Sequence, residues 1–236
     1  MTLEDRLAAA EDAIAQLQHD LAVQQDIEAI RKLQISYCYY MDKGLYDEAV
    51  DCFAPDGELQ FMGGIWRGTD SIRRLYCGRL RNSFTNGING PAYGMMCEHW
   101  PTQDVISVAA DRQSAKGRWR CTLMGAQHDT KENRNPRLPR QWWEHGMYEN
   151  HYVRQDGVWK IACHAYHLFT QVDYEMGWAA AKPIPSPYLT ATFPEDPNGP
   201  DEINGNAHPA WPNTDLVPFH YVHPVTGQPV VPENAR

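Results

Sequence analysis

The chain has 236 residues, of which 42% are hydrophobic and 11% aromatic, so it can bury one full core with extensions. Its formal net charge of -9 argues against a nucleic-acid partner, because phosphate binding needs a basic surface. No apolar run reaches membrane-spanning length, and the N-terminus has the pattern of an amphipathic helix rather than a signal peptide. The six cysteines are dispersed without a CxxC pair, which is typical of free thiols in a cytoplasmic protein and argues against a disulfide or zinc framework.

Residues 2–24 are predicted to form a helix with a narrow apolar seam. Its apolar residues alternate spacings of four and three, which is the heptad pattern of a coiled coil. They are Leu3, Leu7, Ala10, Ile14, Leu17 and Leu21. One interpretation is a helix that lies on its own domain, but the narrow seam favours a self-association helix. Three heptads are short for a free-standing coiled coil, so other contacts have to contribute.

The region from residue 26 to residue 94 is predicted to be mainly helical. Apolar and aromatic residues continue at helical spacing until Gly44, which suits a helix C-cap, and Thr69 suits the N-cap of a later helix. The expected elements are helices at 26–43, 45–53 and 70–81, strands at 58–62 and 65–67, and an Asn- and Gly-rich loop at 82–94.

Long strands are expected in the rest of the domain. The stretches 95–109 and 116–127 are the first two, and residues 142–169 hold a hairpin. Its turn is Asp156-Gly157, a pair that readily adopts the positive φ angles of a type I′ turn. The polar, basic segment 128–141 is long for a loop in a compact domain, so we interpret it as a lid.

The turn sets an expected register for the hairpin. Closing it between Gln155 and Val158 pairs Tyr152 with Ile161, Asn150 with Cys163, Tyr148 with Ala165 and Gly146 with His167. The face that contains Trp159 is apolar near the turn and polar further away, which suggests a pocket that includes His167. The outer face is expected to carry His145, Glu149, His151, Lys160, His164 and Tyr166. Because His164 and His167 then point apart, they do not form a pair of metal ligands.

A Pro-rich segment follows the predicted sheet. Residues 181–236 hold twelve of the chain's 17 prolines and no long periodic stretch, but their aromatic residues argue against simple disorder. We expect an extended arm that packs on its own domain or on a neighbouring subunit. The expected organisation is an oligomerisation helix at 1–24, a domain at 25–178 and an arm at 179–236, with the helix and the arm joining a homo-oligomer.

Several short motifs resemble those of one superfamily. They are Ile30-x-x-Leu33-x-x-x-Tyr37-x-x-x-x-Asp42, Phe53-Ala54-Pro55-Asp56-Gly57, Trp66-x-Gly68 and Asp156-Gly157-Val158-Trp159-Lys160-Ile161. Together with the order of the predicted elements, they resemble the SnoaL-like branch of the nuclear transport factor 2-like superfamily. The resemblance implies an α+β cone, in which a strongly bent antiparallel sheet packs on three helices. It says little about function, because this fold hosts enzymes, binding modules and structural subunits.

Two members of the superfamily, scytalone dehydratase and hexachlorocyclohexane dehydrochlorinase, are cofactor-free lyases with an aspartate–histidine pair. Their aspartate ends the first long helix and corresponds to Asp42; their histidine opens the strand after the third helix and corresponds to His99. The resemblance implies that His99 transfers protons while Asp42 fixes its tautomer and stabilises the imidazolium, without metal or cofactor. The alternative is a solvated carboxylate at a helix end and a strand histidine of no catalytic role.

Other candidate residues are expected around this pair. Tyr37 is assigned a catalytic hydrogen bond, and Tyr40 lies on the same helical face. The predicted substrate-binding residues are Tyr40, Trp66, Arg79, Trp100, Tyr148, Asn150 and His167. Core packing is the competing explanation for the tyrosines and for the tryptophans, including Trp142 and Trp143. A solvated helix face is the better explanation for Arg79.

Three functions remain open at this point. The first is a cofactor-independent lyase acting on a small aromatic alcohol. The aromatic content, length and extensions resemble enzymes of this branch that convert lignin-derived 1,2-diarylpropane-1,3-diols to a stilbene and formaldehyde. The second is a dehydratase or a ketosteroid-isomerase-like proton shuttle on another aromatic or polyketide substrate. The third is a non-catalytic binding module or a protein like the small subunit of a dioxygenase. No nucleophile elbow, phosphate loop or dinucleotide fingerprint supports other chemistry.

Overall fold

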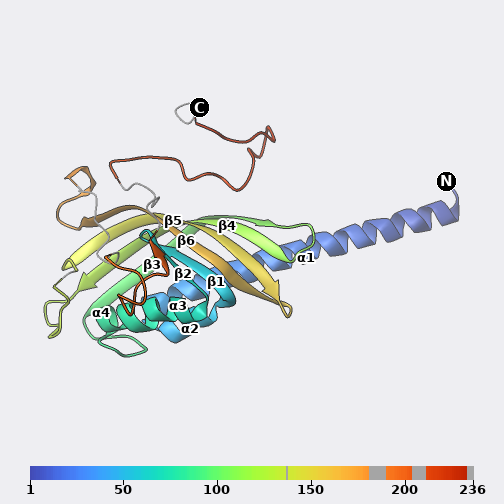
Figure 1. The fold of residues 1–236 in the computed structure, drawn as a ribbon. Helices are drawn as coiled ribbons and strands as arrows, with labels where there is room; N and C mark the ends of the chain where they lie inside the picture. Colours follow the sequence, from blue (N-terminus) through green and yellow to red (C-terminus); the bar gives the residue numbers. More distant parts are fainter. Residues whose placement is uncertain (137, 181–189, 204–210, 233–236) are drawn as a thin grey trace.

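A computed structural model describes residues 1–136, 138–180, 190–203 and 211–232. Its centre is a strongly curved seven-stranded sheet in the order β3-β4-β5-β6-β1-β2-β7, with helices packed against one face (Figure 1). The expected α+β cone is therefore confirmed. The sheet is mainly antiparallel, as expected, and β1 and β6 form one parallel pair within it.

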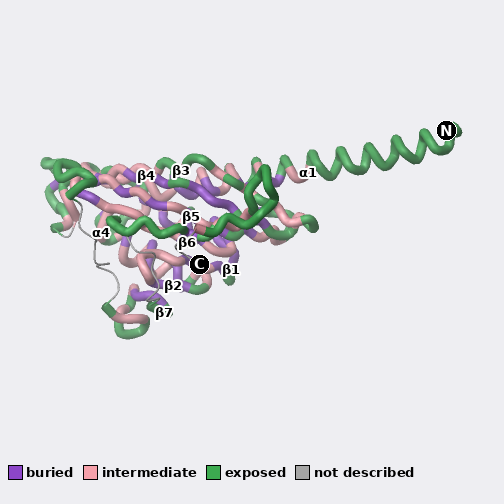
Figure 2. The backbone as a smooth tube through the Cα atoms, turned by 90° about the horizontal axis from the view of Figure 1, so that it is seen from above, coloured by how far each residue is buried: buried purple, intermediate pink, exposed green. Residues whose placement is uncertain are grey.

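The longest helix, α1, spans Leu3–Asp42, so the heptad segment and the helix after it are continuous. A capping box closes its N-terminus, in which Thr2 and Asp5 each accept a hydrogen bond from the other's backbone N–H group. The first half of α1 projects away from the domain (Figures 1 and 2), and Asp26 is the first buried residue along it. The second half packs beneath β3 and leads to the cavity described below.

A second helical layer packs beside α1. It consists of α2 (Tyr46–Asp51) and a continuous run of α3 (Thr69–Arg73), a π-helical segment (Arg74–Leu80) and α4 (Arg81–Thr85). The run continues past the predicted end at residue 81, so the expected loop starts later, at Asn86, which has a left-handed backbone. The predicted N-cap role of Thr69 is wrong, because Gly68 is the residue that precedes the helix.

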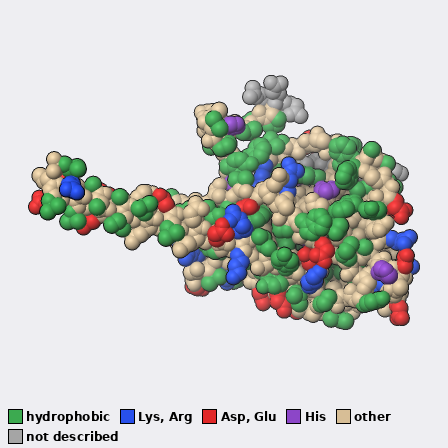
Figure 3. Space-filling model, turned by 180° about the vertical axis from the view of Figure 1, so that it is seen from behind, with side chains coloured by type: hydrophobic (Ala, Val, Ile, Leu, Met, Phe, Trp, Pro, Cys, Tyr) green, Lys and Arg blue, Asp and Glu red, His purple; other side chains and the backbone are tan. Residues whose placement is uncertain are grey.

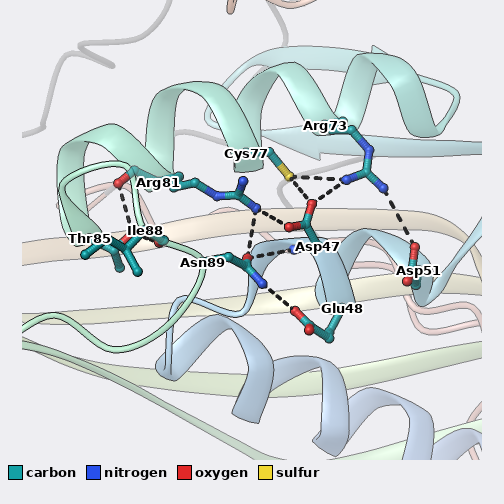
Figure 4. A network of polar contacts seen from close by, with 9 residues as sticks. All are labelled: Asp47, Glu48, Asp51, Arg73, Cys77, Arg81, Thr85, Ile88 and Asn89. Carbon is teal, nitrogen blue, oxygen red and sulfur yellow. Dashed lines mark hydrogen bonds and ion pairs between the residues drawn. The ribbon is translucent and has the colours of Figure 1, made fainter.

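Charged side chains fix α2 to this helical run (Figure 4). Asp47 on α2 accepts hydrogen bonds from Arg73 at 2.5 Å and from Arg81 at 2.7 Å. Asn89, in the loop after α4, accepts a hydrogen bond from Arg81 and donates one to Glu48 at 2.9 Å. The network lies near the surface, so the buried sides of these helices remain apolar and available to the core.

The sheet contains four long strands and three short ones. They are β1 (Phe53–Phe61), β2 (Gly64–Arg67), β3 (Met95–Val108), β4 (Ser114–Gln127), β5 (Gln141–Gln155), β6 (Val158–Asp173) and β7 (Glu202–Ile203). The predicted hairpin turn is confirmed, because Asp156 and Gly157 have φ angles of 51° and 78° and Gln155 pairs with Val158. Among the described residues, no helix is long and apolar enough to cross a membrane.

A β-bulge at Ala162 changes the register of this hairpin. Tyr152 pairs with Ile161 as expected, but the next pair is His151 with Cys163, so β6 carries one extra residue. The predicted pairs beyond the bulge are therefore wrong: Asn150 does not pair with Cys163, Tyr148 pairs with Tyr166 instead of Ala165, and Gly146 pairs with Leu168 instead of His167. One extra residue exchanges the faces of a strand. The side chains of His164 and Tyr166 consequently point into the cone, and their predicted place on the outer face is wrong.

The described C-terminal segments pack on this domain. β7 extends the sheet at β2, and Asp201 accepts a hydrogen bond from the backbone N–H of Arg67 at 2.7 Å. Residues 211–232 cross the convex side of the sheet (Figure 1), where Arg118 donates a hydrogen bond to the carbonyl of Val217 at 3.0 Å. The predicted arm therefore contacts its own domain, whereas its contact with a neighbouring subunit stays a prediction.

Candidate active site

A cavity of about 280 Å³ lies between the concave face of the sheet and the helices. That volume is close to the lower end of the range for small-molecule sites, and such sites are mostly apolar with a few placed polar groups. Its aromatic lining comprises Tyr37, Tyr46, Phe61, Tyr76, Phe84, Trp142, Tyr148 and Tyr166, and its polar lining includes His99, Glu144, His164 and Gln171. Leu138 and Pro139, in the segment predicted to be a lid, also line it.

Asp42 and His99 form a hydrogen-bonded pair at the wall of this cavity. Asp42 is the last residue of α1, and its Oδ1 atom lies 2.7 Å from both the backbone nitrogen and Nδ1 of His99 on β3. The Asp42 side chain is only 3% exposed, whereas the His99 ring reaches the cavity. Because the carboxylate accepts the proton on Nδ1, Nε2 of neutral His99 carries the lone pair. Nε2 is therefore the atom of this pair that can accept a proton from a ligand.

Two tyrosines add buried hydroxyl groups to the lining of the same cavity. The hydroxyl of Tyr37 on α1 lies 2.5 Å from the hydroxyl of Tyr76 in the π-helical segment. Burial raises the pKa of Tyr37 and the pKa of Tyr76 above the usual value of about 10. Both groups are therefore neutral at physiological pH, and together they can donate one hydrogen bond to a ligand oxygen.

His164 is held in a neutral form on the same wall. The Asn150 side chain donates to Nδ1 of His164 at 3.1 Å and accepts from the backbone N–H of Ala165 at 3.1 Å, which fixes its amide orientation. The His164 ring lies between Tyr37 and Tyr148, with centroid distances of 4.9 Å and 4.5 Å. Burial lowers the pKa of His164 to about 3, so the ring stays neutral and Nε2 carries its proton.

Glu144 places a carboxyl group in the lining of the cavity. Its Oε1 atom accepts a hydrogen bond from the hydroxyl of Tyr166 at 2.7 Å, and its Oε2 atom accepts one from the Gln171 amide at 2.8 Å. Burial raises the pKa of Glu144 above its usual value, although these hydrogen bonds and the nearby His99 ring oppose the shift. The cavity lining thus combines two imidazoles, one carboxyl group and several neutral tyrosines, and the Asp42 carboxylate lies behind one of the imidazoles.

Sequence reasoning missed Glu144 and His164 for different reasons. Glu144 lies two alternations before Tyr148 on the same strand, so the period of two could have placed both on the pocket face. His164 was assigned to the wrong face because the alternation of apolar and polar residues along β6 does not reveal the bulge at Ala162. Ala162 is a small residue in a strand rich in aromatic residues, but many strands without a bulge also contain such a residue, so it does not predict one.

Three of the predicted site residues, Tyr37, His99 and Tyr148, line the cavity. Asp42 does not line it but is hydrogen-bonded to His99 from behind. Asn150 is fully buried behind the wall, where it positions His164.

Five other predicted binding residues do not line the cavity. Tyr40 packs on the outside of the core, and Trp66 lies within the core with no exposed surface. Arg79 forms an ion pair with Asp196 of the C-terminal arm. The remaining two, Trp100 and His167, also lie away from the cavity lining.

The side chains of Trp100 and His167 lie on the side of the sheet away from the cavity. Trp100 is 46% exposed, and its ring centroid lies 6.3 Å from that of Trp143. Of the adjacent residues Trp142 and Trp143, only Trp142 lines the cavity. His167 follows Tyr166 on β6 and therefore points to the opposite face of the sheet. The aromatic lining of the cavity therefore includes Trp142 and several tyrosines but neither Trp66 nor Trp100.

The part of the chain that the structure describes shows no group of three or more His, Cys, Asp and Glu residues placed to hold a metal ion. The chemistry that this arrangement offers directly is proton transfer between Nε2 of His99, the Glu144 carboxyl group and bound ligand oxygens.

Comparison with known proteins identifies the family. A sequence profile for the SnoaL-like domain matches residues 22–163. LinA has a similar structure, with a TM-score of 0.52 and 19% identity over 66% of this chain and 93% of that one. A type 2 hexachlorocyclohexane dehydrochlorinase (LinA) gives a TM-score of 0.51 and 19% identity over 65% and 91% of the two chains. A putative scytalone dehydratase from Novosphingobium aromaticivorans gives 0.49 and 20% identity over 71% and 97%.

No curated protein sequence matches the chain. The low identities to the solved structures establish a shared fold and nothing finer. The profile, by contrast, covers more than half of the chain, and it includes Asp42, His99 and the hairpin turn. On that basis, the protein belongs to the SnoaL-like domain family, within the nuclear transport factor 2-like fold.

Proposed function

We propose that the protein is a cofactor-independent lyase that acts on a small aromatic alcohol. The observation that carries this proposal is the 2.7 Å contact between Asp42 and Nδ1 of His99, which leaves Nε2 of His99 at the wall of an aromatic cavity. A histidine backed by a carboxylate can accept a proton and return it to a leaving group. A hexachlorocyclohexane dehydrochlorinase among the similar structures carries the name of an elimination enzyme, which supports the same class.

The substrate we propose is a lignin-derived 1,2-diarylpropane-1,3-diol. Loss of its benzylic hydroxyl as water gives a quinone methide when that ring carries a para-hydroxyl group. Loss of the terminal carbon as formaldehyde then restores the aromatic ring and gives a stilbene. His99, with Asp42 behind it, transfers the protons, and Tyr37 donates a hydrogen bond to a substrate oxygen. The aromatic lining supplies flat apolar surfaces for the aryl groups.

One observation favours a second candidate, a dehydratase or isomerase-like proton shuttle on another aromatic or polyketide substrate. Glu144 and Tyr166 lie together in an apolar part of the cavity, 2.7 Å apart. A carboxyl group kept neutral beside a tyrosine can bind an enolate oxygen, which is how ketosteroid isomerase stabilises its intermediate. A third candidate, a non-catalytic binding module, requires neither the histidine–aspartate geometry nor the neutral His164.

The test is an incubation of the purified protein with an erythro 1,2-diarylpropane-1,3-diol in the presence of a metal chelator and without added cofactor. Stilbene absorbance and trapped formaldehyde are followed together. We expect both products in equal amounts. A double-bond shift without formaldehyde, in an assay with a β,γ-unsaturated ketone, would favour the proton shuttle. Binding of the diol with no turnover of either compound would favour the binding module.

A further inference from the structure

Glu144 and His99 lie in one row across the sheet. His99 on β3 pairs with Leu123 on β4, Leu123 pairs with Glu144 on β5, and Glu144 pairs with Gln171 on β6. All four side chains line the cavity. Neighbouring strands are about 4.8 Å apart, so the backbones of His99 and Glu144 are about 9–10 Å apart. A ligand ring that contacts both side chains would therefore lie above Leu123.

Burial raises the pKa of the Glu144 carboxyl group, which shifts it towards the protonated acid. Its side chain is buried, and the charged neighbour that acts on it among the described residues is His99 rather than a lysine or arginine. Burying a carboxylate costs more free energy than burying the neutral acid, and the hydrogen bonds from Tyr166 and Gln171 offset part of that cost. The titratable groups that face it are His99 and Cys97 on β3, Cys121 on β4 and Tyr166 on β6.

These neighbours supply no permanent positive charge. Burial raises the pKa of Cys97, of Cys121 and of Tyr166, so the two thiols and the hydroxyl remain neutral. His99 is the one neighbour that can become positive, and it does so when it accepts a proton. A proton taken up by His99 therefore makes it easier for Glu144 to release its own.

We propose that Glu144 is the general acid of this cavity, which protonates the leaving benzylic hydroxyl while Nε2 of His99 takes the proton from a para-hydroxyl group at the other end of the same ring. The inference rests on the proposed function and narrows its substrates to para-hydroxybenzylic alcohols. It assigns a catalytic role to a residue outside the aspartate–histidine pair.

The step balances without an oxidant or reductant. The phenolic proton moves to Nε2 of His99, and the electron pair of the O–H bond becomes the second bond of a ring carbonyl. The electrons shift through the ring, and the benzylic C–O bond breaks with its pair on oxygen. That oxygen takes the proton of Glu144 and leaves as water. The products are a neutral quinone methide, water, an imidazolium and a carboxylate.

Contacts already present stabilise both charged products. Asp42 faces the imidazolium through Nδ1 of His99 at 2.7 Å. Tyr166 and Gln171 each donate one hydrogen bond to the new carboxylate, at 2.7 Å and 2.8 Å. Transfer of one proton from His99 to Glu144, through the released water, then restores the starting protonation of both residues.

The first experiment measures binding and needs no turnover. The probe is 4-hydroxybenzaldehyde, because it carries a phenol and a carbonyl oxygen at opposite ends of one ring and cannot eliminate. Glu144→Leu removes the donor and is expected to weaken probe binding at least tenfold, whereas Glu144→Gln keeps an N–H donor and is expected to bind within about threefold of the wild type. Glu195→Gln, at an exposed site in the arm, is the matched control.

The second experiment compares leaving groups. Glu144→Gln is expected to lower kcat at least 100-fold for 4-hydroxybenzyl alcohols, with KM little changed. The same variant is expected to release acetate from 4-hydroxybenzyl acetate at nearly the wild-type rate, because acetate leaves without a proton. Circular dichroism verifies that the variants fold.

The outcomes separate the two proposals. A wild-type protein that binds the probe but turns over no aromatic alcohol contradicts the proposed function, and the Glu144→Leu binding result then still decides whether this site holds the ring. Unchanged probe binding in Glu144→Leu, no probe binding by the wild type, or equal losses of kcat for the alcohol and the acetate in Glu144→Gln would each overturn the role of Glu144.

Discussion

His164 is kept neutral by the way its ring is enclosed. Its Nδ1 accepts a hydrogen bond from Asn150, and the rings of Tyr37 and Tyr148 cover it, so a positive charge there has no solvent around it. The pKa is lowered from 6.5 to about 3, which means that between these values the unfolded chain binds a proton that the folded protein does not. The stability that this group contributes is complete above about pH 6.5 and is lost as the pH falls towards 3.

We therefore predict that His164→Gln has a shallower pH dependence of stability than the wild type. The wild-type free energy of unfolding should fall by up to about 1.4 kcal/mol for each pH unit below about pH 6.5 because of this residue alone. Urea unfolding at about pH 6.5 and about pH 4.5 measures the difference. The control His19→Gln, on the exposed half of α1, should keep the wild-type dependence. Identical slopes in His164→Gln and the wild type would show that the ring is not held neutral.

The order and type of most elements followed from periodicity and turn chemistry. The Asp156-Gly157 turn and the long strands had clear local signals, and the resemblance of the Asp42 segment placed the aspartate at the end of a helix. The bulge at Ala162 had none, because it depends on how β6 fits both β5 and the parallel strand β1. That single residue moved His164 and Tyr166 into the cavity. Long-range pairing is the information that local patterns lack.

A cluster on the convex side of the sheet fastens the C-terminal arm. Arg118 on β4 is almost fully buried, forms an ion pair with Glu149 at 2.5 Å and donates to backbone carbonyls of the arm. The ring of Phe219 lies 4.3 Å from the guanidinium, and His220 hydrogen-bonds to Glu149. The buried guanidinium of Arg118 contacts a carboxylate, two backbone carbonyls and an aromatic ring at once, so this one side chain holds several groups of the arm in place.

Arg118→Ala is expected to release this part of the arm. Removing Arg118 takes the guanidinium away from the buried Glu149 carboxylate and leaves it with His220 as its partner. Breaking a buried ion pair costs up to about 3–5 kcal/mol, so the arm should detach before the domain unfolds. Hydrogen exchange of the amides in residues 217–221 should increase strongly, while the amides of β5 stay protected. Arg120→Ala, at an exposed position on the same strand, provides the matched control. Unchanged exchange in Arg118→Ala would mean that other contacts hold the arm.

The projecting half of α1 is the most unusual feature of the overall shape. Figure 3 shows hydrophobic side chains along it, and the seam residues Leu3, Leu7, Ile14, Leu17 and Leu21 are between 54% and 79% exposed. An isolated helix with this much exposed apolar surface gains free energy by pairing. The heptad spacing suits a second copy of the same helix, so we propose that the protein self-associates through it, with the arm adding further contacts.

The double variant Leu7→Asn/Leu17→Asn is expected to shift the protein to a smaller species, because it places two polar side chains in the seam. Sedimentation velocity over a range of concentrations measures this. The control Asp12→Asn/His19→Asn changes the opposite side of the helix and should leave the assembly as it is. If the wild type and both double variants sediment as the same monomer, the seam does not mediate association.

The central claim is that Asp42 and His99 perform acid–base catalysis in this cavity, and the most direct measurement is kcat/KM of the variants in the cofactor-free diol assay. We predict that His99→Ala and Asp42→Asn lower kcat/KM by about 10²–10⁴-fold, with wild-type circular dichroism, whereas the exposed control His19→Ala keeps full activity. Near-wild-type kcat/KM in both Asp42→Asn and His99→Ala would contradict the account.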